Sequence, residues 1–146
     1  MKLGFQSFAL LALLFLPLQG VAQSSIRPDS GPLTAKELSN LQEVFGNHLH
    51  DRILSRQNML AEIKDVLRNR IQIVKLDNPQ DQKSCSLLSD VALYSAFNPD
   101  IKRDKRFDPS SFNPLKYAFN YRINGASMYR VDQTNYYIII NPRSTE

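Results

Sequence analysis

The sequence has no tryptophan and a single cysteine, Cys85, among 146 residues. One thiol cannot close an intramolecular disulfide, so the chain is not a disulfide-stapled scaffold. Because cysteine outside disulfides is among the most buried residue types, we favour a buried and inert Cys85 over one that pairs between molecules. Glycine is also scarce, with five residues in the chain, and no segment has the glycine spacing of a phosphate-binding loop.

A large excess of charge of one sign is missing as well. Lysine and arginine number 18 against 14 acidic residues, which gives a formal net charge of +4. This balance favours solubility and weak attraction to anionic surfaces. It falls short of the concentrated basic surface of a nucleic-acid-binding protein, so we expect no nucleic-acid partner.

Long hydrophobic runs are confined to the N-terminus. Residues 8–16 read FALLALLFL, with a lysine before the run and a proline directly after it. A membrane-spanning helix needs about 20 apolar residues, so this run is too short to cross a bilayer. Small residues at Gly20 and Ala22 precede a cut before Gln23 and complete the pattern of a signal peptide over residues 1–22. We therefore expect an exported protein, periplasmic or secreted, that is soluble after cleavage near Ala22 and retains no transmembrane span.

Two changes of composition delimit one domain after the leader. Residues 23–33 are rich in Ser, Pro and Gly and favour a flexible arm. Residues 34–142 have the length and apolar patterning of a single domain, for which we expect the α+β class. The expected architecture has two N-terminal amphipathic helices packed on a small antiparallel sheet that ends in a C-terminal three-stranded meander.

Apolar residues at steps of three and four predict the two helices. Thr34 and Glu37 form a capping box that begins the first helix. A break at Gly46-Asn47 allows one long helix or two short ones. The first apolar stripe consists of Leu38, Leu41, Phe45, Leu49 and Ile53, and the second of Leu60, Ile63, Leu67 and Ile71.

β-branched and aromatic residues predict the strands. Residues 70–76 form one strand, and residues 136–140, which are apolar on both faces, form another inside the sheet and beside it. Residues 117–123 alternate directly into Asn124-Gly125; their apolar spacing also fits a helix, but this dipeptide is a strong hairpin signal because a type I′ turn needs positive φ. Residues 87–97 fit either a short helix or a short strand.

Turn lengths then predict the register of the meander. The turn at Asn124-Gly125 places Ile123 opposite Ala126, Tyr121 opposite Met128 and Phe119 opposite Arg130. A second turn over residues 132–135 pairs Val131 with Tyr136, Tyr129 with Ile138 and Ser127 with Ile140. The tyrosines of this region are expected to pack the sheet rather than form a binding platform.

Three C-terminal segments carry a family resemblance, namely FNPLKY at residues 112–117, YRVD at 129–132 and TNYYIII at 134–140. Together with a leader that ends in Val-Ala-Gln and with LRNR at residues 67–70, they resemble small exported proteins of Bacteroidota type. The resemblance implies a location in the cell envelope. Such proteins have no assigned activity, so the resemblance carries over no site residues.

Neither group of metal-ligating residues has the spacing of a metal site. His48 and His50 lie two apart, whereas helical metal pairs use a spacing of four. Asp100, Asp104 and Asp108 recur without the alternate carboxylates, glycine and glutamate of a calcium loop. We expect neither a metal nor another cofactor.

The densest basic cluster lies in the irregular connection at residues 98–111. It consists of Lys102, Arg103, Lys105 and Arg106, with Asp104 among them. Such a loop favours contact with a phosphate, an anionic polysaccharide or a lipid headgroup, although a solvated loop face explains the same pattern.

Catalytic chemistry has no local motif in the chain. Nucleophilic catalysis needs a nucleophile, a base and an orienting group, and Cys85 lies in no such motif. A small hydrolase that uses Cys85 or His48 is therefore the weakest of three hypotheses. The first is a non-enzymatic module that contacts an envelope protein, and the second is an anion binder that uses the basic loop.

Overall fold

The computed structural model describes residues 31–78 and 84–143, so the leader predicted at 1–22 and most of the predicted arm lie outside the described residues. The helices are α1 (Ala35–Phe45) and α2 (Gln57–Asp65). The strands are β1 (Ile71–Lys75), β2 (Ser86–Leu87), β3 (Ser127–Arg130) and β4 (Tyr136–Ile140). The α+β class is confirmed.

The capping box at Thr34 forms as its residue types predict. The Thr34 hydroxyl accepts from the Glu37 amide at 3.2 Å, and the Thr34 amide donates to the Glu37 carboxylate at 2.8 Å. Gly46, with a φ of 49°, ends α1 at the predicted break. The apolar stripe begins later than expected, because Leu38 is 44% exposed while Leu41 is fully buried.

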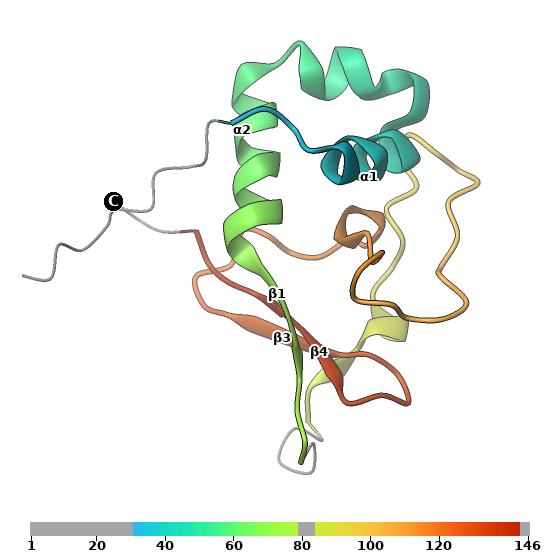
Figure 1. The fold of residues 1–146 in the computed structure, drawn as a ribbon, viewed down its shortest axis with the longest axis vertical. Coiled ribbons are helices and arrows are strands. Elements are labelled where there is room, and N and C mark those ends of the chain that lie inside the picture. Colours follow the sequence, from blue (N-terminus) through green and yellow to red (C-terminus); the bar gives the residue numbers. More distant parts are fainter. Residues whose placement is uncertain (1–30, 79–83, 144–146) are drawn as a thin grey trace, which may run out of the picture.

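Irregular helical turns connect α1 to the sheet. A 3-10 turn η1 (Gly46–His48) and a π turn η2 (His50–Leu54) lead from α1 to α2. A second π turn η3 (Val66–Arg70) continues α2 directly into β1. No loop separates the helical turn η3 from β1, so the chain runs from α2 straight into β1 (Figure 1).

The sheet has the order β1-β4-β3-β2, which places the apolar strand β4 inside it and beside β1, as predicted. The predicted pairs Tyr129–Ile138 and Ser127–Ile140 both form. However, β2 runs parallel to β3, so the sheet is mixed and the expected antiparallel sheet is wrong in this respect. Two residues are too few for any period in the sequence to predict this strand.

The predicted strand at residues 117–123 is absent, and with it the third strand of the meander. This segment forms a single bridge, between Leu93 and Tyr117, and the predicted pairs of Ile123, Tyr121 and Phe119 do not form. Gly125 lacks the positive φ of a type I′ turn. The alternation reflects one-sided burial instead, because Phe119 is 6% exposed while its neighbours face solvent.

The core consists of two clusters, one on each side of the irregular segment 88–123. The sheet cluster contains Leu88, Val91, Phe112, Tyr117, Phe119, Val131, Ile138 and Ile140. The helical cluster contains Leu41, Val44, Phe45, Leu49, Ile53 and Ile101. The irregular segment therefore lies as a middle layer between helices and sheet (Figure 1), and the expectation that the helices pack directly on the sheet is wrong.

Candidate functional site

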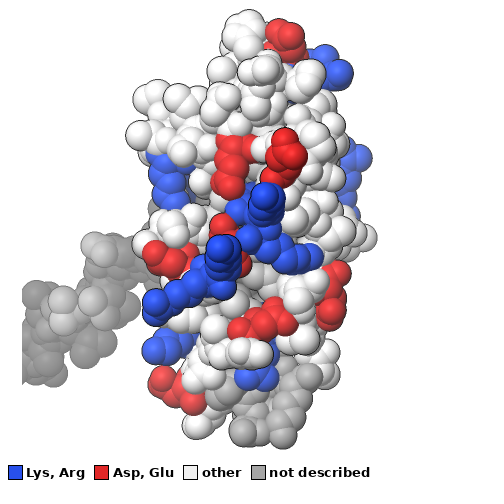
Figure 2. Space-filling model, turned by 90° about the vertical axis from the view of Figure 1, so that its right-hand side faces the viewer, with Lys and Arg blue, Asp and Glu red and all other residues white. Residues whose placement is uncertain are grey.

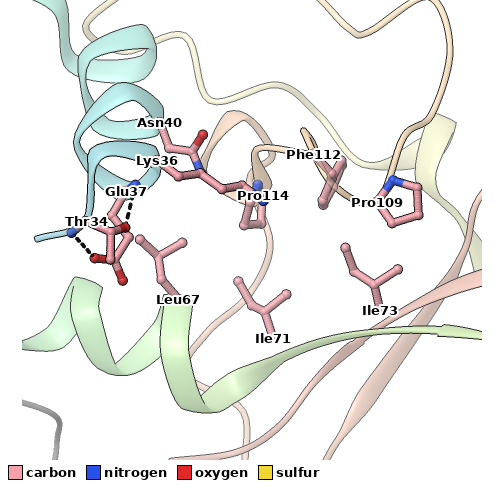
Figure 3. A pocket seen from close by; sticks show the side chains of 10 residues that line it. All are labelled: Thr34, Lys36, Glu37, Asn40, Leu67, Ile71, Ile73, Pro109, Phe112 and Pro114. Atoms are coloured by element: carbon pink, nitrogen blue, oxygen red, sulfur yellow. Dashed lines mark hydrogen bonds between the residues drawn. The ribbon is translucent and has the colours of Figure 1, made fainter.

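A groove of about 380 Å³ lies between α1, the middle layer and β1 (Figure 3). The sheet supplies apolar lining residues, and α1 supplies polar ones. The lining residues are Thr34, Lys36, Glu37, Asn40, Leu67, Ile71, Ile73, Pro109, Phe112 and Pro114. Ile71 and Ile73 of β1 point into it from one side, and Phe112 and Pro114 face them (Figure 3).

An ion pair fixes the end of the groove at the start of α1. Arg68 donates to both carboxylate oxygens of Glu37, from Nε at 2.6 Å and from Nη2 at 2.7 Å. Arg68 also donates to the Pro32 carbonyl at 2.8 Å. The hydrogen bond from Arg68 lowers the pKa of Glu37 to about 2, so the carboxylate stays ionised throughout the physiological range. The bidentate geometry makes this end of the groove rigid.

The outer edge of β1 has no strand partner among the described residues. The Leu76 amide donates to Asn135 at 2.9 Å and the Arg70 carbonyl accepts from Asn141 at 2.8 Å, so the even-numbered residues of β1 point their backbone groups at β4. Backbone direction alternates along an antiparallel strand. The N–H and C=O groups of Ile71, Ile73 and Lys75 therefore point outward, beside the groove that the same two isoleucines line.

The basic loop predicted as an anion site is only partly available. Arg103 donates to the carbonyls of Leu88, at 3.0 Å, and of Val91, and its guanidinium lies over the Tyr117 ring. Through these contacts the guanidinium of Arg103 links separate parts of the middle layer, so Arg103 has a structural role. Lys102, Lys105 and Arg106 are exposed, and Figure 2 shows the basic side chains gathered on this face with acidic residues around them.

The cavity beside this loop has a volume of about 340 Å³ and is lined by Arg103, Lys105 and Arg106, but not by Lys102. Asp132 lies in the same cavity and accepts from the Ser89 amide at 3.0 Å and hydroxyl at 2.5 Å. Burial alone raises the pKa of Asp132, but the hydrogen bonds from Ser89 outweigh it and the pKa is lowered. This carboxylate remains charged and opposes anion binding.

Lys116 is a buried cation that the sequence analysis did not single out. It is 3% exposed, and its ammonium lies 2.7 Å from Asp104 and 3.1 Å from Glu43. Burial lowers the pKa of Lys116, but the hydrogen bonds to Asp104 and Glu43 more than compensate, so the pKa is raised. Asp104, one of the three aspartates for which the sequence indicates no calcium loop, thus belongs to an ion pair.

His48 and Cys85, the remaining candidates for catalytic residues, lie in different parts of the fold. His48 packs against the Phe97 ring, while Cys85 is half-buried directly before β2. Neither residue lines any of the cavities described here. His50 is solvent-exposed and contacts Asp51 at 3.3 Å. Within residues 31–78 and 84–143, no group of three or more His, Cys, Asp or Glu side chains could hold a metal ion.

In that same part of the chain, no helix combines the length and the apolar character needed to cross a bilayer. The chain matches no protein-family model, no curated protein and no solved structure. Function is therefore inferred from the groove, the free strand edge and the charged surfaces alone.

Proposed function

We propose that this protein is an exported, non-enzymatic binding module of the cell envelope that captures an extended segment of a partner envelope protein. The segment adds to the outer edge of β1 as a further strand. Its backbone bonds to Ile71, Ile73 and Lys75, and its side chains enter the groove beneath α1. Adding a strand to an exposed sheet edge is an established mode of peptide recognition.

The observation that carries this proposal is the coincidence of two features at Ile71 and Ile73. Their backbone groups point away from β4 at the edge of the sheet, and their side chains line the groove. Backbone bonds supply affinity in this mode, while pockets for alternate side chains supply specificity. Because Ile71, Ile73, Leu67 and Phe112 are apolar, the segment should carry apolar residues at alternate positions.

The proposal can be tested with a library of extended seven-residue peptides panned against residues 23–146. We expect enriched peptides to alternate apolar and polar residues. Binding should shift the amide resonances of Ile71, Ile73 and Lys75 and slow their hydrogen exchange. Enriched peptides without alternation, or exchange protection elsewhere only, would contradict edge addition.

A matched pair of variants separates backbone from side-chain effects. Lys75→Pro removes an outward N–H that β4 does not use, and proline is tolerated at such edge positions. Lys75→Ala removes the side chain and keeps the N–H. We expect Lys75→Pro to weaken peptide binding at least about tenfold, the equivalent of one lost hydrogen bond plus strand mismatch, and Lys75→Ala to leave it nearly unchanged.

A second candidate function is binding of an anionic polysaccharide by the basic loop. The favouring observation is that Arg103, Lys105 and Arg106 line one cavity. Since Arg103 has a structural role, the informative variant is Lys102→Ala/Lys105→Ala/Arg106→Ala. It should abolish salt-sensitive retention on an alginate column without changing thermal stability. Equal retention of this variant and the wild type would exclude the loop.

A further inference from the structure

A second groove runs beside α2 and is cationic at one end and apolar at the other. The cationic end has a volume of about 630 Å³ and is lined by Arg70, Arg122 and Arg143 together with Asn124. The apolar end, of about 320 Å³, is lined by Met59, Ile63, Val66, Leu115 and Phe119. Both ends are lined by Glu62, Tyr121 and Arg122, so the two cavities adjoin along these residues, and we call the pair the trough.

Arg70 is the buried charge at the cationic end. It is 4% exposed, and its Nε donates to the Asn141 carbonyl at 3.0 Å while Nη2 donates to the Tyr121 carbonyl. No described residue accepts from Nη1, and no described carboxylate pairs with this guanidinium. A buried cation without an opposite charge is costly, so an anion entering this cavity would gain from it.

Two further arginines give the same cavity an excess of positive charge. Arg122 and Arg143 are exposed, and neither forms an ion pair with a described carboxylate. Glu62 is the single acidic residue among the described lining residues, so three cations face one anion. Arginine forks suit planar carboxylates and phosphates, and the Asn124 amide adds a further donor type.

The apolar end lies along α2 and continues toward its first turn. Val66 and Phe119 are buried, whereas Met59 is 40% exposed and leaves apolar surface open to solvent. The trough follows α2 from Met59 to Asp65, about 9 Å at 1.5 Å per residue, and then the π turn η3 as far as Arg70. This length suits a single extended hydrocarbon chain, and flexible methionine surfaces adapt to such ligands.

We propose that this trough binds a single-chain anionic amphiphile. The anionic head contacts Arg70, Arg122 and Arg143, and the hydrocarbon chain lies along Met59 and Ile63. The head is a carboxylate or a phosphate, as in a fatty acid or a one-chain phospholipid. This site shares no residue with the β1 groove, so its failure would leave the proposed peptide binding untouched.

Calorimetric titration of residues 23–146 with dodecanoate and with dodecyl phosphate, below their micelle concentrations, tests the proposal. We expect saturable binding of at least one probe with one site per chain. Binding of the carboxylate alone identifies a fatty-acid source, and binding of the phosphate alone a phospholipid source. The amide resonances of Met59, Arg122 and Asn124 should shift together.

Three controls test whether the anionic head and the hydrocarbon chain of the ligand both contribute to binding. Arg122→Ala/Arg143→Ala, which spares the buried Arg70, should weaken binding at least tenfold, whereas the matched loop variant Lys102→Ala/Lys105→Ala should not. Dodecyl maltoside, with a neutral head, and inorganic phosphate, without a chain, should each bind at least tenfold more weakly. The proposal is overturned if dodecyl maltoside or inorganic phosphate binds as tightly as the anionic amphiphile. It is also overturned if the arginine variant keeps the wild-type affinity, or if neither dodecanoate nor dodecyl phosphate binds saturably.

Discussion

Lys116 holds α1 to the basic loop through one buried ammonium between two carboxylates. Asp104 and Glu43 are 42% and 45% exposed in their side chains, whereas that of Lys116 is 4% exposed. The two partners therefore differ in how well they tolerate loss of the pair. An exposed carboxylate can be hydrated, but a buried ammonium left alone cannot.

We accordingly expect opposite outcomes from the two ways of breaking this pair. Lys116→Met should change the free energy of unfolding by less than about 1 kcal/mol, because an apolar side chain of similar length fills the site. Glu43→Gln/Asp104→Asn should cost about 2–4 kcal/mol, since it strands a buried charge. Urea denaturation measures both, with Lys102→Met as the exposed control; a costlier Lys116→Met would show that the ion pair itself stabilises the fold.

The ionised Glu37 carboxylate should contribute to the free energy of unfolding, and acid should remove this contribution. Its pKa falls from 4.5 to about 2 on folding, chiefly through the hydrogen bond from Arg68. A depressed pKa stabilises the fold above pH 4.5, and this stabilisation is lost as the pH falls from 4.5 toward 2. The difference corresponds to about 3 kcal/mol.

The measurement is the free energy of unfolding between pH 6 and pH 2. Glu37→Gln should be less stable at pH 6 and should lose less stability on acidification than the wild type. Asp51→Asn is a suitable control because the Asp51 side chain is exposed and its carboxylate contacts the exposed His50. A pH profile of Glu37→Gln that parallels the wild type would exclude Glu37 as the source.

At the scale of elements, two glycines test the turn that the sequence mispredicted. Gly46 has a φ of 49° and ends α1, whereas Gly125 has no positive φ; an added Cβ meets no atom within 4 Å at either position. Gly46→Ala should therefore destabilise by about 1–3 kcal/mol through backbone strain, because a φ of 49° with a ψ of −127° is readily adopted by glycine alone. Gly125→Ala should be neutral or stabilise by up to about 1 kcal/mol, because it restricts the unfolded chain.

Thermal unfolding of both variants checks this contrast. A type I′ hairpin at Asn124-Gly125 would make Gly125→Ala as harmful as Gly46→Ala, since both central residues of that turn need positive φ. In the hairpin that does form, the positive φ lies at Gln133, at 55°, between β3 and β4. Gln133→Gly should accordingly be tolerated with a small effect.

At the scale of the whole molecule, export remains the property on which the proposed function depends. If residues 1–22 are the signal peptide that their pattern predicts, the full chain expressed in a Gram-negative host should be processed before Gln23. The mature product should appear in the periplasmic fraction, and mass spectrometry should find Gln23 as its first residue. Ala22→Trp should block processing, because the cut requires a small residue at this position.

A matched substitution outside the recognition site, Ser24→Ala, should leave processing unchanged. Retention of residues 1–22 in a soluble cytoplasmic product would contradict the leader and the envelope location together. Retention in the membrane fraction would contradict cleavage alone. The peptide and amphiphile experiments use residues 23–146, so their results do not depend on this outcome.

Much of the fold and little of the candidate site could be predicted from the sequence. The start of α1 at Thr34, the break at Gly46, the strand β1 and the interior place of β4 all follow from local patterns. The groove and the trough could not be predicted, because each brings together residues distant in the sequence, such as Arg70 with Arg143. The basic loop was visible as a pattern, but the structural role of Arg103 depends on carbonyls of another segment.

By itself, the sequence determined the features that neighbouring residues control. Capping at Thr34, the helical period of α1 and the turn length between β3 and β4 act within a few residues, so their outcome is local. The tertiary structure decided what residues 117–123 do with their backbone. Alternation specifies that one face is buried, but the Ala118 amide donates to the Ala92 carbonyl, at 2.8 Å, a distant residue of the middle layer that no local pattern specifies.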